Sequence, residues 1–161
     1  MNETAFHGCN KYTSFIKKIN NCDMNSIMDQ YSLRPGDEII VPKSRLNMIK
    51  HHAMYLGQDL SSAHWIVENR IGDGVRTTTA DAFFEDVDQI TAIERFRGSD
   101  HERKLLVNRA LSLVGRPYNL IKYNCEHFTS ELRTGIPESK QVSAFALAIL
   151  GVLLISAFLT D

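Results

Sequence analysis

The sequence is poor in cysteine, has no excess of either charge and lacks a secretory leader. Its three cysteines, Cys9, Cys22 and Cys125, form no CxxC pair and no regular disulfide spacing, which favours free thiols in a reducing compartment. The first residues contain no basic segment followed by an apolar one, so nothing marks the chain for secretion. Because 18 basic residues nearly balance 19 acidic ones, no bulk field recruits nucleic acid. We expect a main domain that is exposed to the cytosol.

The length and the order of the elements predict a single α+β domain. A chain of 161 residues is long enough for one hydrophobic core and too short for two ordinary ones. Turn-forming residues at 34–37 (RPGD) precede a β-rich run, and the alternating segments that read as strands are 38–41, 51–56, 63–68 and 90–96. Two helices are predicted after them, at 99–114 and 124–133. Strands grouped in the middle favour a central antiparallel sheet over a doubly wound one.

A long uncharged run lies near the end of the sequence, at residues 142–159 (VSAFALAILGVLLISAFL). As a helix it would be about 27 Å long at about 1.5 Å per residue, close to the hydrocarbon thickness of a bilayer. The alternative is a buried core helix, but such a helix normally keeps one polar face. Arg133 and Lys140 precede the run, which agrees with a cytosolic domain on a single-pass anchor.

Cys125 is the cysteine placed for chemistry, because the predicted helix starts at Asn124. Asparagine is a favoured N-cap, and unpaired N–H groups at a helix start favour a thiolate. A catalytic thiol also needs a base, and the sequence offers six histidines: His7, His51, His52, His64, His101 and His127. His51 and His52 share one predicted strand and His64 lies on the next, but strand alternation alone does not choose between the first two. No HxxxH or CxxC spacing supports a zinc site in their place.

Several of these segments resemble one known family. Residues 124–128 (NCEHF) with 131–135 (ELRTG) resemble the cysteine motif of the lecithin:retinol acyltransferase-like family, which includes the phospholipase A and acyltransferases, also called HRAS-like suppressors. Residues 51–57 (HHAMYLG) resemble its histidine strand, residues 34–37 its Pro-Gly-Asp opening, and residues 109–115 the helix before the cysteine. The similarity runs from about residue 33 to 141 and does not cover the first thirty residues.

The resemblance implies a fold and a set of roles. The family has a circularly permuted, NlpC-type papain-like fold, in which the histidines precede the cysteine. It implies that Cys125 is the nucleophile, that His51 is the general base and acid, and that His64 orients His51, although the intervening turn is one residue longer here. His52 stands where the family usually has Trp or Tyr, a change that bears on substrate choice. Glu126 and His127 are expected to hold the helix start together.

The implied activity is that of a thiol-dependent phospholipase A1/A2 and acyltransferase without cofactor or metal. It would act on glycerophospholipids such as phosphatidylcholine and phosphatidylethanolamine through a thioester, with water or a lipid amine or alcohol as acceptor. The alternatives are a retinol O-acyltransferase, an NlpC-type cysteine peptidase or amidase, and a non-catalytic membrane adaptor. The expected organisation is an N-terminal extension at 1–32, a catalytic domain at 33–141 and a transmembrane tail at 142–159, at the cytosolic face of intracellular membranes.

Overall fold

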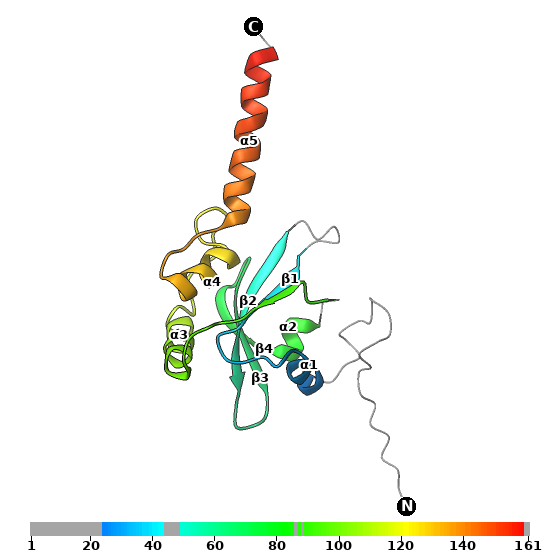
Figure 1. Cartoon of the computed structure of the whole chain (residues 1–161), viewed down its shortest axis with the longest axis vertical. Coiled ribbons are helices and arrows are strands. Elements are labelled where there is room, and N and C mark those ends of the chain that lie inside the picture. Colours follow the sequence, from blue (N-terminus) through cyan, green and yellow to red (C-terminus); the bar gives the residue numbers. More distant parts are fainter. Residues whose placement is uncertain (1–23, 44–48, 86, 88, 160–161) are drawn as a thin grey trace, which may run out of the picture.

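The structure, a computed structural model, describes residues 24–43, 49–85, 87 and 89–159 (Figure 1). Its elements, in chain order, are α1 (Met24–Tyr31), β1 (Glu38–Pro42), β2 (Lys50–Gln58), β3 (His64–Arg70), β4 (Gly74–Thr79), α2 (Ala80–Phe84), β5 (Ala92–Glu94), α3 (Asp100–Ser112), α4 (Cys125–Thr134) and α5 (Lys140–Leu159). This composition is α+β, as the sequence predicts. Cys9 and Cys22 lie outside the described residues.

The five strands form one sheet in the order β4-β3-β2-β1-β5, and every pairing is antiparallel. The strands predicted at 38–41, 51–56 and 63–68 correspond to β1, β2 and β3, whereas β5 occupies only the middle of the predicted 90–96 segment. Strand β4 was not predicted. Its sequence, GVRTTT, has one apolar side chain, Val75, and therefore no apolar alternation to detect.

The sheet is covered by helices on both faces, and each face has its own core. Helices α1 and α2 pack on one face, where Ile39, Ala53 and Ile66 from three adjacent strands meet Phe84. Helices α3 and α4 cover the other face, over Met54 and Val67 (Figure 1). Odd-numbered residues of β2 therefore face α2 and even-numbered ones face α4, which sets where each histidine of this strand points.

Helix α1 falls within the segment expected to be an N-terminal extension. Its Ile27 and Met28 are buried against the sheet in the first core cluster. The part of residues 1–32 that the structure describes therefore contributes to the core, so the domain begins before residue 33. The remainder of that segment, residues 1–23, lies outside the described residues.

Helices α3 and α4 start as their sequences predict. The Ser99 hydroxyl and the Glu102 carboxylate form a reciprocal capping box at the start of α3. At the start of α4, Asn124 is the N-cap and its Oδ1 accepts from the backbone N–H groups of Glu126 and His127, both at 3.0 Å. Gly135 ends this helix with φ of +80°, a conformation that glycine adopts without strain.

Helix α5 projects away from the domain (Figure 1). It is the one described helix that is long and apolar enough to cross a membrane, over Lys140–Ala157 with a mean hydropathy of 1.8. None of that window is buried inside the structure, and side chains such as Phe145 and Leu147 are about 70% exposed. A core helix would be covered, so the alternative of a buried helix does not describe α5.

Candidate active site

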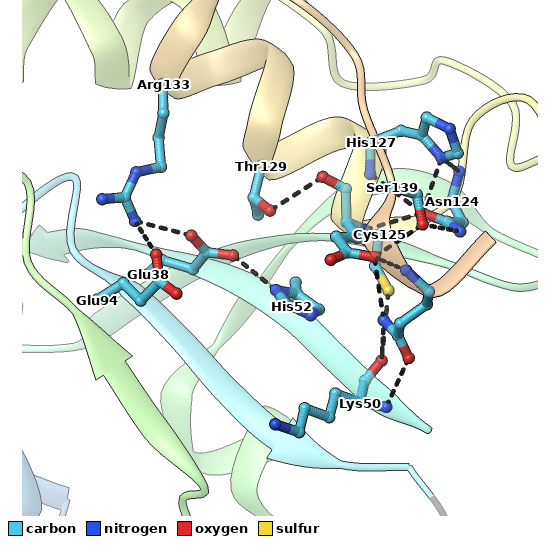
Figure 2. Close-up of polar contacts among 12 residues, drawn as sticks. Glu38, Lys50, His52, Glu94, Asn124, Cys125, His127, Thr129, Arg133 and Ser139 are labelled. Atoms are coloured by element: carbon cyan, nitrogen blue, oxygen red, sulfur yellow. Dashed lines mark hydrogen bonds and ion pairs between the residues drawn. The ribbon is translucent and has the colours of Figure 1, made fainter. Parts of the chain in front are cut away.

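Cys125 is the first residue of α4 and lies against the start of β2. Its side chain is nearly buried, and its Sγ is 3.8 Å from the Lys50 carbonyl oxygen (Figure 2). Strand β3 pairs with β2 only from Ala53 onward, so the start of β2 has no strand neighbour on that side. The helix start brings the thiol to this open end of the strand.

His51 follows Lys50 on β2, and its imidazole is held by a carboxylate. Its Nε2 is 2.6 Å from Glu68 Oε2, and the ring stacks on Phe83 of α2 at 6.0 Å between centroids. The second Glu68 oxygen accepts from Arg76 Nε at 2.9 Å. Because an ionised carboxylate can only accept, Nε2 carries the proton and Nδ1 is the acceptor of neutral His51. Nδ1 is buried and makes no hydrogen bond of ordinary geometry among the described residues.

The pKa values of Cys125, His51 and Glu68 depend on one another. Burial opposes charge on Cys125, but the neighbouring His51 imidazole holds the pKa of the thiol below its usual value. Burial likewise opposes charge on His51, but Cys125 and then Glu68 raise the pKa of its imidazole. Glu68 is buried too, and His51 followed by Arg76 lowers the pKa of its carboxyl. His51 therefore favours the thiolate of Cys125 and the carboxylate of Glu68, and both of these favour the imidazolium of His51.

The expected partner of His51, His64, lies elsewhere. His64 is paired with Gln58, at the opposite end of β2 from His51, and its Nδ1 is 2.6 Å from the Tyr55 hydroxyl. The structure therefore brings Cys125 and His51 together but not His64, and the side chain that contacts the His51 ring nitrogen is Glu68. The pairing of β2 and β3 carries a register shift between Tyr55 and Gly57, and His64 lies beyond it, next to the turn.

Glu68 was missed by sequence reasoning, although one signal was present. It follows the apolar run Trp65 to Val67 in a strand that is buried on both faces, and it is itself only 3% exposed. A carboxylate in such a strand needs a cationic or hydrogen-bonding partner. The sequence could therefore have identified Glu68 as a candidate site residue, but it could not have identified His51 as its partner.

His52 points to the opposite face of β2 from His51, because side chains alternate along a strand. It belongs to a separate buried group with Glu38 (Figure 2). Its Nδ1 is 2.7 Å from Glu38 Oε1, and Arg133 donates to the other Glu38 oxygen at 2.8 Å. Burial opposes charge on His52, but the Glu38 carboxylate raises the pKa of the imidazole. The charge of His52 also reaches Cys125, where it ranks below His51 in lowering the pKa of the thiol.

Glu126 and His127 hold the start of α4 in place. The His127 Nδ1 accepts from the Asn124 backbone N–H at 3.3 Å, which completes a capping box. The Glu126 carboxylate turns toward the first turn of α5, where it accepts from the Ser139 hydroxyl at 2.7 Å. A cavity of about 670 Å³ lies beside this junction, between the His127 side chain and α5, and Cys125 is not part of its wall.

No group of three or more His, Cys, Asp and Glu side chains is arranged for a metal ion within the part of the chain that the structure describes.

Comparison with known proteins gives two similar relatives and one family. Over 51 residues the chain is 47% identical to mouse phospholipase A and acyltransferase 3, a stretch that covers 29% of this chain and 32% of that protein. Over 49 residues it is 47% identical to human phospholipase A and acyltransferase 2, covering 29% and 30% respectively. The aligned stretch thus spans about a third of each relative. The family model described as lecithin retinol acyltransferase matches residues 31–138, well over half of the chain, and the protein therefore belongs to this family.

Proposed function

We propose that the protein is a cysteine-dependent phospholipase A and acyltransferase that acts on glycerophospholipids, with Cys125 as nucleophile and His51 as general base and acid. The observation that carries the proposal is the series Cys125, His51, Glu68: a thiol of lowered pKa, an imidazole of raised pKa and a carboxylate 2.6 Å from that imidazole. The names of the mouse and human relatives pair the same two activities. The histidine precedes the cysteine, in agreement with a permuted papain-like domain.

In the first half of the reaction the Cys125 sulfur attacks the ester carbonyl of a phospholipid. Nδ1 of His51 takes the thiol proton, and the new S–C bond converts the carbonyl into an oxyanion. The backbone N–H of Cys125, at the first turn of α4, is the donor proposed for that oxyanion. When the C–O ester bond breaks, His51 returns the proton to the departing lysophospholipid and a thioester remains on Cys125.

In the second half an acceptor attacks the thioester. Neutral His51 takes a proton from water, or from the amine or alcohol of a lipid such as phosphatidylethanolamine. The thioester C–S bond then breaks, and the Cys125 sulfur leaves as a thiolate paired with the imidazolium. Hydrolysis releases a fatty acid, whereas attack by phosphatidylethanolamine gives its N-acyl derivative. Glu68 stays ionised throughout and holds the His51 ring in one tautomer.

We further propose that α5 anchors the domain at the cytosolic face of an intracellular membrane. The helix is uncharged after Lys140 and is exposed along its length, and the domain precedes it as one folded unit. Anchoring keeps the thiol at the surface where phospholipid is concentrated. The proposed catalytic domain includes α1 as well as residues 33–141, because Ile27 and Met28 of α1 are part of its core.

The test is to trap the acyl-enzyme. Purified full-length protein in detergent is incubated with phosphatidylcholine labelled in the acyl chains, and labelled Cys125 is sought by peptide mass spectrometry after acid quenching. Label on Cys125 in the wild type, absent from Cys125→Ala, supports the proposal; lipid release that survives in a folded Cys125→Ala protein refutes it. Retinol and a model peptide amide, offered in parallel, separate the retinol acyltransferase and peptidase alternatives. A protein that is acylated by none of these substrates is the non-catalytic adaptor.

A further inference from the structure

The Gln141 side chain joins the first turn of α5 to the start of β2. Its Oε1 accepts from the Lys50 backbone N–H at 3.0 Å, and its Nε2 donates to the Lys50 carbonyl at 3.4 Å. This is the pair of hydrogen bonds that a neighbouring strand would make. Because β3 does not pair with this end of β2, the Gln141 amide takes the place of a strand.

The same carbonyl receives the catalytic thiol. Cys125 Sγ lies 3.8 Å from the Lys50 oxygen, so Gln141 and Cys125 share one acceptor. His51 is the next residue along the strand. Any shift of Lys50 therefore moves the carbonyl beside the sulfur and the imidazole that takes its proton.

A second set of bonds fixes Gln141 to the start of α4. The Glu126 carboxylate accepts from the Gln141 backbone N–H at 3.0 Å, from its Nε2 at 3.4 Å and from the Ser139 hydroxyl at 2.7 Å. Ser139, which is only 5% exposed, also accepts from Asn124 Nδ2 at 3.2 Å and from the Val142 N–H at 3.2 Å. The first turn of α5 is thereby bonded to the residues on both sides of Cys125.

We infer that Gln141 is a positioning residue, which holds the Lys50 end of β2 against Cys125 and fixes the direction in which α5 leaves the active site. The inference rests on the proposed role of Cys125 as nucleophile. Misplacement of reacting atoms by about 1 Å can lower a rate by about a hundredfold, so a bond at this position matters for turnover. A helix tied in this way sets the orientation of the thiol relative to the bilayer, whereas a flexible linker would not.

Two variants and one control test this role in the full-length protein with Cys9→Ser and Cys22→Ser, so that Cys125 is the only thiol. Gln141→Leu removes both bonds to Lys50 at similar volume. Gln141→Glu keeps the shape and the acceptor, removes the donor and sets a second carboxylate beside Glu126. Ser143→Ala is the control, because the Ser143 hydroxyl bonds the Ser139 carbonyl, one turn back along the chain, and makes none of the bonds to Lys50 or Glu126.

The first measurement is the rate of alkylation of Cys125 by iodoacetamide across a pH series, which requires no lipid turnover. His51 and His52 on β2 and Tyr118 before α4 interact electrostatically with the thiol, and all three remain in every variant. Loss of the Gln141 donor leaves the Lys50 carbonyl oxygen with more negative potential beside the sulfur, which disfavours the thiolate. We expect the midpoint of alkylation to move to higher pH in both Gln141 variants and to stay in place in Ser143→Ala.

The second measurement is acyl release from phosphatidylcholine in detergent micelles and in vesicles. The Gln141 variants should lose about tenfold in kcat on micelles with little change in KM, and more on vesicles, where the direction of α5 also matters. Wild-type alkylation profiles and rates in a folded Gln141→Leu protein would overturn the inference. If the leucine variant does not fold, the isosteric glutamate variant decides by the same criteria. A third result is also possible: the wild type releases no acyl chain, but the alkylation midpoint still moves in the Gln141 variants. That result would support the positioning of the thiol by Gln141 and would refute the proposed function.

Discussion

Replacing Glu68 is the most direct way to separate the base from the group that orients it. The Glu68 carboxylate makes a charge-assisted hydrogen bond to His51 at 2.6 Å and is almost fully buried. Bonds of this kind contribute about 1.5 to 3 kcal/mol. At about 1.36 kcal/mol per tenfold in rate, Glu68→Ala should lower kcat/KM by about 10- to 160-fold. Glu68→Gln, whose amide oxygen still accepts from Nε2, should lose less.

The charge of Glu68 should also appear in the pH profile. Without it the pKa of His51 falls, because Glu68 is one of the groups that raise it. The weaker imidazolium then stabilises the Cys125 thiolate less, so the pKa of the thiol rises. The pH window in which thiolate and imidazolium coexist therefore narrows from both sides in Glu68→Gln.

The assay is acyl release from micellar phosphatidylcholine between about pH 5 and 10, with kcat and KM separated at each pH. Asp73→Asn is the matched control, because Asp73 pairs with the same Arg76 at 3.3 Å and does not touch His51. It should keep the wild-type profile, as should His64→Gln at the far end of β2. A Glu68→Gln profile that coincides with the wild type, or a loss in His64→Gln as large as in Glu68→Ala, would show that Glu68 does not orient His51.

Three further predictions concern the thiol, the core and the anchor. Cys125→Ser should abolish acyl release with an unchanged thermal melt, and His51→Ala should lose about two to four orders of magnitude in kcat; activity within tenfold of wild type in either would remove that residue from the mechanism. Asp37, which is fully buried, keeps a pKa below its usual value because the Arg103 and Arg95 hydrogen bonds outweigh burial, so its contribution to stability is present above about pH 4 and is lost as pH falls. Asp37→Asn should therefore lower the free energy of unfolding at pH 7 by about 3 to 5 kcal/mol, since Arg103 is left uncompensated, and by less in acid; equal losses at both pH values in urea titrations would contradict this. Truncation after Ser143 should give a soluble protein that keeps a cooperative thermal melt and its activity on micellar phospholipid. In cells this protein should no longer be found in the membrane fraction. Loss of the cooperative melt would mean that α5 completes the core.

The sequence predicts well what depends on neighbouring residues. Asn124 as a cap before Cys125, the Ser99 capping box and the strands around His51 all follow from short patterns that the structure reproduces. In these segments the backbone bonds that form the element are made within a few residues, and the side chains that satisfy them are local too.

Contacts that join distant segments were not predictable in the same way. Gln141 meets Lys50 across 91 positions of sequence, and no periodicity marks either residue. Strand β4 pairs with β3 along six residue pairs, and its sequence has β-branched Val and Thr but no apolar alternation. Both contacts depend on how the chain folds and not on a local apolar pattern.

The place of Glu68 beside His51 follows from side-chain alternation on β3 and from the register between β2 and β3. Residues 64, 66 and 68 share one face of β3, because side chains alternate along a strand, and Ile66 lies in the core beneath α2 together with Ala53. In the register of this strand pair, His64 lies beside Gln58, whereas Glu68 is paired with Ala53, two residues from His51. A neutral imidazole would only orient His51, whereas the ionised Glu68 also stabilises protonated His51, the form that donates to the leaving group in the proposed mechanism.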